Sequence, residues 1–181
     1  MVTAHAALPD AGTAAAIWRA LGSVVDPEIP SVSIVELGIV RSVEAEGDGW
    51  VVSITPTYSG CPATRVIEAD IHGALAAIAP ADVRVVSRLA PAWTTDWIAP
   101  EARVKLREAG IAPPRQRVTE AAVSLQALRG GSASPESGGG VACPRCGSLR
   151  TSRVAQFGST ACKAQYRCAD CLEPFDYFKP Y

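Results

Sequence analysis

The sequence has few of the features that mark membrane, secreted or nucleic-acid-coating proteins. No apolar run among its 181 residues approaches the roughly 20 needed to span a bilayer. The first residues, MVTAHAALPDAGTAAA, lack the basic and long apolar segments of a secretory signal peptide. The formal net charge is only -1, with no run of Lys or Arg, which disfavours a coat for nucleic acid or an anionic membrane. We therefore expect a cytoplasmic protein in a reducing compartment.

Histidine is scarce too, which limits the catalytic sites that the chain can build. Of the two histidines, His5 lies in the N-terminal segment and His72 within a predicted helix. A site of two histidines and one carboxylate therefore cannot be assembled. We find no glycine-rich phosphate-binding loop and no nucleophilic triad. The sequence predicts no catalytic residues, and it favours an accessory protein over an enzyme.

The composition is that of a folded chain with one clear boundary. Hydrophobic residues make up 48% and charged residues 19%, so a packed core is expected. Residues 130–140, GGSASPESGGG, are typical of a flexible linker. We expect a compact domain over 10–112, a helical extension (118–129) and linker over 113–140, and a small domain over 141–181. This last part is too short to fold on a hydrophobic core alone, so it needs a metal or disulfides.

The first domain is expected to be α/β (α+β), in the order helix, strand, strand, helix, strand. EGDGW separates the two central strands, which we expect to form a hairpin. A short helix should follow, opened by Pro100 and closed by Gly110. The expected ranges are a helix from Asp10 to before DPEIP, a strand over 34–45 that Gly38 interrupts, a strand over 51–57, a helix over 62–79 and a strand over 83–90.

Four cysteines near the C-terminal end form two C-x2-C pairs that 21 residues separate. They are Cys143, Cys146, Cys168 and Cys171. Each pair can chelate an ion from one tight turn, and four thiolates in a tetrahedron suit zinc, so the pattern predicts a zinc β-ribbon. An iron–sulfur cluster on the same thiolates is the open alternative, and disulfides are disfavoured in a reducing compartment. The aromatic residues expected to cover the metal site are Phe175, Tyr177 and Phe178.

A fifth cysteine, Cys162, lies six residues before Cys168. We interpret it as a small buried residue, and the alternative is a ligand that replaces one of the four. Residues 141–181 carry six basic and three acidic side chains. This small excess favours a protein partner for the ribbon over a nucleic acid, and a zinc-ribbon nucleic-acid binder is the least favoured of our hypotheses.

Cys61 stands apart from the other five cysteines, in the stretch TPTYSGCPAT. We expect it at the N-terminus of the helix over 62–79, where the helix dipole and unpaired amides would stabilise a thiolate and lower its pKa. The stretch DPEIP presents Asp26 and Glu28 on a rigid, non-helical backbone. A soft thiolate beside hard carboxylates could hold iron transiently with open coordination positions. The simpler alternatives are that Cys61 fills a turn and that Asp26 caps local amides.

Two sets of motifs resemble known families. VVDPEIPSVSIVELGIVRSVE, followed by VVSITPTYSGCPAT, is similar to the SufT-like metal–sulfur cluster assembly family. PAWTTDWIAPEARVKLREAGIAPP, with CPRCGS, STACKAQYRC and CLEPFDYFKP, resembles the PaaD (PaaJ) family of subunits of the bacterial phenylacetyl-CoA epoxidase system. The likeness covers nearly all of residues 14–181 apart from the linker, whose length is a departure.

The resemblance implies a fold and a role. It implies a compact α/β domain and a C-terminal zinc ribbon, with the acidic motif on Asp26-Pro27-Glu28, the motif cysteine on Cys61 and zinc on the four paired cysteines. It also implies aerobic phenylacetate catabolism, in which a di-iron oxygenase, fed by a flavin and iron–sulfur reductase, epoxidises phenylacetyl-CoA. Such a subunit would help to mature a metal centre of that system, rather than carry out epoxidation.

The implied cofactors are zinc and, transiently, iron or an iron–sulfur cluster. The implied partners are the reductase or oxygenase subunits and iron–sulfur assembly proteins, with no nucleic acid and no membrane. The alternative is a structural or docking subunit of the oxygenase that transfers no metal.

Overall fold

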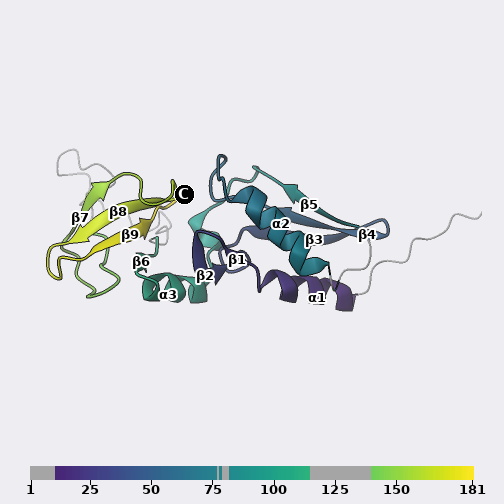
Figure 1. Ribbon diagram of the computed structural model, residues 1–181, viewed down its shortest axis with the longest axis horizontal. Coiled ribbons are helices and arrows are strands. Elements are labelled where there is room, and N and C mark those ends of the chain that lie inside the picture. The colour runs from purple at the N-terminus through teal and green to yellow at the C-terminus, as the bar shows by residue number, and fades with distance from the viewer. Residues whose placement is uncertain (1–10, 77, 79–81, 115–139) are drawn as a thin grey trace, which may run out of the picture. The chain divides into compact units, whose positions relative to one another are not determined.

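The computed structural model describes residues 11–76, 78, 82–114 and 140–181, which form two units (Figure 1). The first unit extends to Lys105 and also contains Tyr181, and the second runs from Leu106 to Pro180. A three-stranded sheet lies in the first unit and a four-stranded sheet in the second.

The first unit has the predicted succession of helix, strand, strand, helix and strand, so the mixed α/β class is confirmed. Its elements are α1 (Ala11–Leu21), β1 (Val25–Asp26), β2 (Ile29–Ser33), β3 (Val40–Glu46), β4 (Gly49–Ile54), α2 (Thr64–Leu75), β5 (Val83–Ser87) and the 3-10 helix η1 (Thr95–Trp97). Strands β3 and β4 form the predicted antiparallel hairpin, and β5 pairs parallel to β4 after the α2 crossover. Strands β1 and β2, which were not predicted, form a short hairpin around the DPEIP turn.

The core of the first unit lies between its three-stranded sheet and two helices. Helix α2 buries Ile67, Ile71 and Leu75 at helical spacing, and α1 buries Ile17 and Leu21, all at most 3% exposed. Each such side chain contributes about 1.5–3 kcal/mol when fully buried. Strand β4 is buried along its whole length, because it has a strand on either side. Figure 1 shows α2 running across the sheet.

Helix α2 is shorter at both ends than the helix predicted over 62–79. It begins at Thr64, because the residues before it form a turn. In this turn the Cys61 carbonyl accepts hydrogen bonds from the Thr64 amide (3.3 Å) and the Thr64 hydroxyl (2.9 Å). Ala63 is the N-cap residue. The prediction of Cys61 at the helix N-terminus was therefore wrong, because Cys61 and Pro62 both precede the N-cap residue.

The strand predicted over 34–45 is interrupted at Gly38 as predicted, but its first part is a turn and not a strand. The chain turns over residues 34–38, and β3 begins only at Val40. Gly38 has a φ of +68° within this turn, and a Cβ there would lie 2.6 Å from both Cβ and the carbonyl oxygen of Trp97. The break therefore needs glycine for two reasons, its left-handed backbone and the close approach of Trp97.

The second unit is built on a four-stranded sheet in the order β6-β9-β8-β7. Its elements are the end of α3 (Pro100–Glu108), β6 (Ile111–Ala112), β7 (Thr151–Ala155), β8 (Lys163–Cys168) and β9 (Pro174–Phe178). Pro100 opens α3 and Gly110, at a φ of +79°, follows its end, as predicted. Strands β7, β8 and β9 are an antiparallel meander, and β6 joins it parallel to β9. The helix expected over 118–129 and nearly all of the linker lie outside the described residues.

Two of the three aromatic residues predicted to cover the four-cysteine site do so, whereas Phe178 is buried but is not part of that cluster. Phe175 and Tyr177 pack in one buried cluster with Cys143 and Cys168. The ring of Tyr166 lies against both of them, with centroids 5.9 Å from Phe175 and 5.4 Å from Tyr177. This cluster is small, and two of its five buried members are cysteines.

Candidate metal and thiol sites

The four paired cysteines meet in one cluster. Their sulfur atoms all lie within 4.8 Å of one another, with 3.7 Å between Cys143 and Cys171 and 3.6 Å between Cys146 and Cys168. A disulfide would need about 2.05 Å, so these four cysteines are not joined by disulfides. Four sulfurs at about 2.3 Å from one tetrahedral ion would be about 3.8 Å apart. The cluster therefore has the donor set and the spacing that a single tetrahedral metal ion requires.

Two similar turns present the four sulfurs. In the first turn, the Gly147 amide donates to the Cys143 carbonyl (2.9 Å), and in the second the Cys168 amide donates to the Glu173 carbonyl (3.0 Å). The residue after the second cysteine of each pair is left-handed, with φ +78° at Gly147 and +65° at Leu172. Each C-x2-C pair thus folds back on itself, and its sulfurs face the same point.

Backbone amides also stabilise negative charge on the cluster. The amides of Cys171 and Asp170 point at the Cys168 sulfur, the latter at 3.4 Å, and they lower the pKa of that thiol to about 6. A thiolate is the form that binds metal. Cys168 is accordingly poised as an anionic ligand at neutral pH.

Cys162 lies outside this cluster. Its side chain is buried, and its sulfur lies 3.0 Å from the hydroxyl oxygen of Thr160. The four cysteines form their group without it. The expectation of a small buried residue is confirmed.

Cys61 lies in the turn between β4 and α2 and is half-buried. Its amide donates to the Tyr58 carbonyl at 3.1 Å. Burial raises the pKa of the Cys61 thiol above its usual value. The Ala63 amide and the Thr64 hydroxyl oppose this shift through hydrogen bonds to the sulfur, whereas the charges of Glu28 and Asp26 add to it.

The predicted lowering of this pKa is therefore wrong. Because α2 begins only at Thr64, Cys61 is not at the helix N-cap where the dipole acts most strongly. Burial and two carboxylates outweigh the local hydrogen bonds. The thiol is mainly protonated at neutral pH unless a cation displaces the proton.

The acidic motif is held in place by its own backbone. Asp26 is 8% exposed, and its Oδ1 accepts hydrogen bonds from the amides of Glu28 and Ile29, both at 2.9 Å. The simpler interpretation of Asp26, as a cap of local amides, is thus correct for this oxygen. The electrostatic effect of both carboxylates on Cys61 places the motif and the thiol in one neighbourhood. In the described ranges, however, the four-cysteine cluster is the group with three or more ligand atoms close together, so this neighbourhood is not a closed metal site.

This electrostatic coupling predicts how Cys61 reacts. Glu28→Gln removes a negative charge, so the pKa of the thiol should fall and its thiolate fraction at pH 8 should rise. We expect iodoacetamide to alkylate Cys61 roughly twofold faster in this variant, because the thiolate is the nucleophile. Mass spectrometry of the Cys61 peptide over a pH series measures the rate. The control is Glu44→Gln on β3, whose carboxylate does not shift this pKa, and equal rates in the two variants would refute the coupling.

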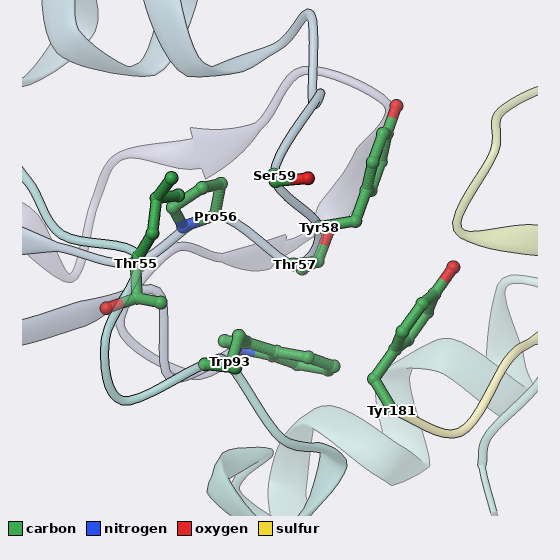
Figure 2. Close-up of a pocket in the computed structure, with 9 residues that line it drawn as sticks. Thr55, Pro56, Thr57, Tyr58, Ser59, Trp93 and Tyr181 are labelled. Carbon is green, nitrogen blue, oxygen red and sulfur yellow. The ribbon is translucent and has the colours of Figure 1, made fainter.

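The first unit also contains a pocket that was not predicted from the sequence. The pocket measures about 330 Å³ and is lined by Thr55, Pro56, Thr57, Tyr58, Ser59, Leu89, Ala92, Trp93 and Tyr181 (Figure 2). Most of these residues follow the ends of β4 and β5, which are parallel neighbours. The carboxyl ends of parallel strands meet at one sheet edge, where ligands commonly bind. The sequence does contain a signal for this pocket: the segments TPTYS and LAPAW each lie at the end of a predicted strand.

Comparisons with known proteins agree with this two-part structure. Residues 14–87 match the family described as "Iron-sulfur cluster assembly protein", and residues 130–179 match the "PaaD zinc beta ribbon domain". Solved structures that resemble the chain are a domain of unknown function from Bacillus anthracis (27% identity, 52% of this chain and 92% of that one, TM-score 0.48) and a Mycobacterium tuberculosis protein described as associated with [Fe-S] complex assembly and repair (32% identity, 61% and 94%, TM-score 0.31).

The relative with a curated description covers almost the whole chain. It is an Escherichia coli (strain K12) protein described as one of the subunits of a "Putative 1,2-phenylacetyl-CoA epoxidase", and it is 49% identical over 163 residues, which are 90% of each chain. Within the described ranges, none of the helices has the length and hydropathy that crossing a membrane requires. The shared length and the two matching domains show that the chain belongs to the PaaD family, with an iron–sulfur cluster assembly domain followed by a PaaD zinc β-ribbon.

Proposed function

We propose that this protein is a cytoplasmic accessory factor that helps to mature an iron or iron–sulfur centre of a phenylacetyl-CoA epoxidase system. It does not carry out the epoxidation itself. The name of the Escherichia coli relative supports the system, and the match to the iron–sulfur cluster assembly family supports the kind of work. The scarcity of histidine and the lack of a base near Cys61 in the sequence support an accessory role.

The observation that carries the proposal is the coupling of half-buried Cys61 to Asp26 and Glu28. Both carboxylates disfavour a bare thiolate, and both favour a cation beside the sulfur. Iron would therefore bind as the Cys61 thiol loses its proton to solvent, and a proton from solvent would return to the sulfur when the metal passes to a client protein. This exchange suits transient holding, because a metal at this site must compete with a proton for the sulfur.

We propose a different task for Cys143, Cys146, Cys168 and Cys171. Their sulfur separations of 3.6 and 3.7 Å support one tetrahedral zinc ion. An iron–sulfur cluster would divide its four cysteines among two or more iron atoms and would hold sulfurs on different irons farther apart than the 4.8 Å within which all four lie here. Zinc with four thiolate ligands has no open coordination position, so its role here is structural and it supplies free energy of folding. The folded ribbon then docks the client protein.

The test is Cys61→Ser in a host that makes the reductase and oxygenase subunits. We expect one zinc per chain and an unchanged fold, but at least a severalfold loss of iron or cluster in the client, because a serine hydroxyl is a poor ligand for iron. Metal analysis and the visible absorbance of the client, purified without oxygen, measure this. The matched control is Cys162→Ser, which alters a buried thiol outside both sites. Full client occupancy with Cys61→Ser would rule out metal handling by this thiol.

A second function, a docking role without metal transfer, has one observation in its favour. Among the residues described, the four cysteines form a closed set of metal ligands. No such set is formed by Cys61 with Asp26 and Glu28. Under this alternative Cys61→Ser would be silent, and loss of the ribbon would abolish the complex with oxygenase subunits. Co-purification of those subunits with each variant distinguishes the two functions.

A further inference from the structure

The pocket beside the Cys61 turn is walled by aromatic rings. The Trp93 ring is its floor, held by a 3.0 Å hydrogen bond from its Nε1 to the Leu37 carbonyl. The Tyr181 ring meets Trp93 edge-on at 6.3 Å and 68°, within the same unit. Figure 2 shows the Tyr58 ring standing on the other side of the space above Trp93. Three rings therefore face one small volume.

The chemistry of the lining restricts the ligand. None of the nine lining side chains carries a charge, so an anionic ligand would lose hydration without gaining a counter-ion. A volume of about 330 Å³ is at the lower end of the range for ligand pockets, enough for one ring and a short connection. Rings prefer edge-to-face or offset contact with other rings. The lining thus fits an uncharged aromatic ring.

We propose that this pocket receives an aromatic side chain, Phe or Tyr, from a protein partner. One of the lining residues, Leu89, is a large apolar side chain that is 59% exposed, and Trp and Tyr are among the residues most enriched in the centres of protein interfaces. Tyr58 connects the pocket to the thiol, because its carbonyl accepts the Cys61 amide while its ring forms a wall. The preference of this pocket for an aromatic ring is argued from its lining alone. The inference that a protein partner supplies this ring rests on the proposed function.

The test titrates N-acetyl-L-phenylalaninamide into the full-length, 15N-labelled chain. The Trp93 indole N–H resonance, assigned with Trp93→Phe, should shift with a dissociation constant on the order of 1 mM. The cyclohexylalanine analogue, which keeps the shape without the ring electrons, should bind roughly three- to tenfold more weakly. Tyr58→Ala should weaken binding by a similar factor. Val66→Ala, an exposed apolar residue of α2 outside the pocket, should not.

Three results would overturn the proposal. No shift up to about 10 mM would show that the pocket takes no ring, and equal binding of the cyclohexyl analogue would show that no aromatic preference exists. Phenylacetamide binding roughly tenfold more tightly than the capped amino acid would assign the pocket to a free aromatic molecule instead of a side chain. Cys61→Ser should bind the probe as the unaltered chain does. The probe titrations therefore test ring binding in the pocket, whereas the metal content of the client with Cys61→Ser tests metal handling. Each proposal can fail without the other.

Discussion

Cys168→Ser is expected to unfold the second unit and to leave the first unit folded. Cys168 is fully buried, and its sulfur belongs both to the four-cysteine cluster and to the small aromatic core. Structural zinc supplies on the order of 10 kcal/mol to small domains, more than so small a core can replace. We expect bound zinc to fall from one per chain to none. NMR resonances of β7, β8 and β9 should lose their dispersion, while those of β3, β4 and β5 stay.

The control for this experiment is Cys162→Ser. It makes the same change of sulfur to oxygen at a second buried cysteine, only six positions away, whose sulfur is not in the cluster. The control should keep its zinc. Its free energy of unfolding should fall by about 1–2 kcal/mol, the cost of burying a serine hydroxyl with only some of its hydrogen bonds made. A Cys168→Ser chain that retains both zinc and a folded ribbon would show that the metal is not what holds this unit together.

Gly38→Ala is expected to destabilise the first unit by about 2–5 kcal/mol, the second-largest effect. The new Cβ would lie 2.6 Å from two atoms of Trp97, and the backbone φ of +68° disfavours any residue with a side chain. Because Leu37 accepts the Trp93 indole hydrogen bond next to this turn, the strain should also reach the pocket. Urea unfolding followed by tryptophan fluorescence measures the loss.

Gly47→Ala is the matched control. Gly47 also has a positive φ, +59°, but a Cβ there would meet nothing within 4 Å. Only the left-handed backbone is then disfavoured, at about 1–2 kcal/mol. The difference between the two variants measures the clash with Trp97. Equal losses would mean that the turn moves away from Trp97 without cost.

Several features of this protein follow from local sequence alone. The two C-x2-C pairs located the cluster, because a tight turn brings both sulfurs of a pair together whatever surrounds it. Pro100 and Gly110 bounded α3, since both residues act through their own backbone. The alternation of apolar residues predicted the helix and strand order of the first unit for the same local reason.

Other features depend on residues far apart in the sequence, and these only the tertiary structure decided. The pKa of Cys61 is raised by burial and by carboxylates more than thirty positions earlier, which outweigh the local amides that the sequence made visible. The pocket exists because β4 and β5 lie parallel and end at one edge, which brings Tyr58 and Trp93 together. Ile111–Ala112 joins the ribbon sheet for a similar reason, through pairing with β9. Local patterns thus determined the elements and the ligand turns, whereas long-range packing set the charge state of the thiol and the shape of the surface around it.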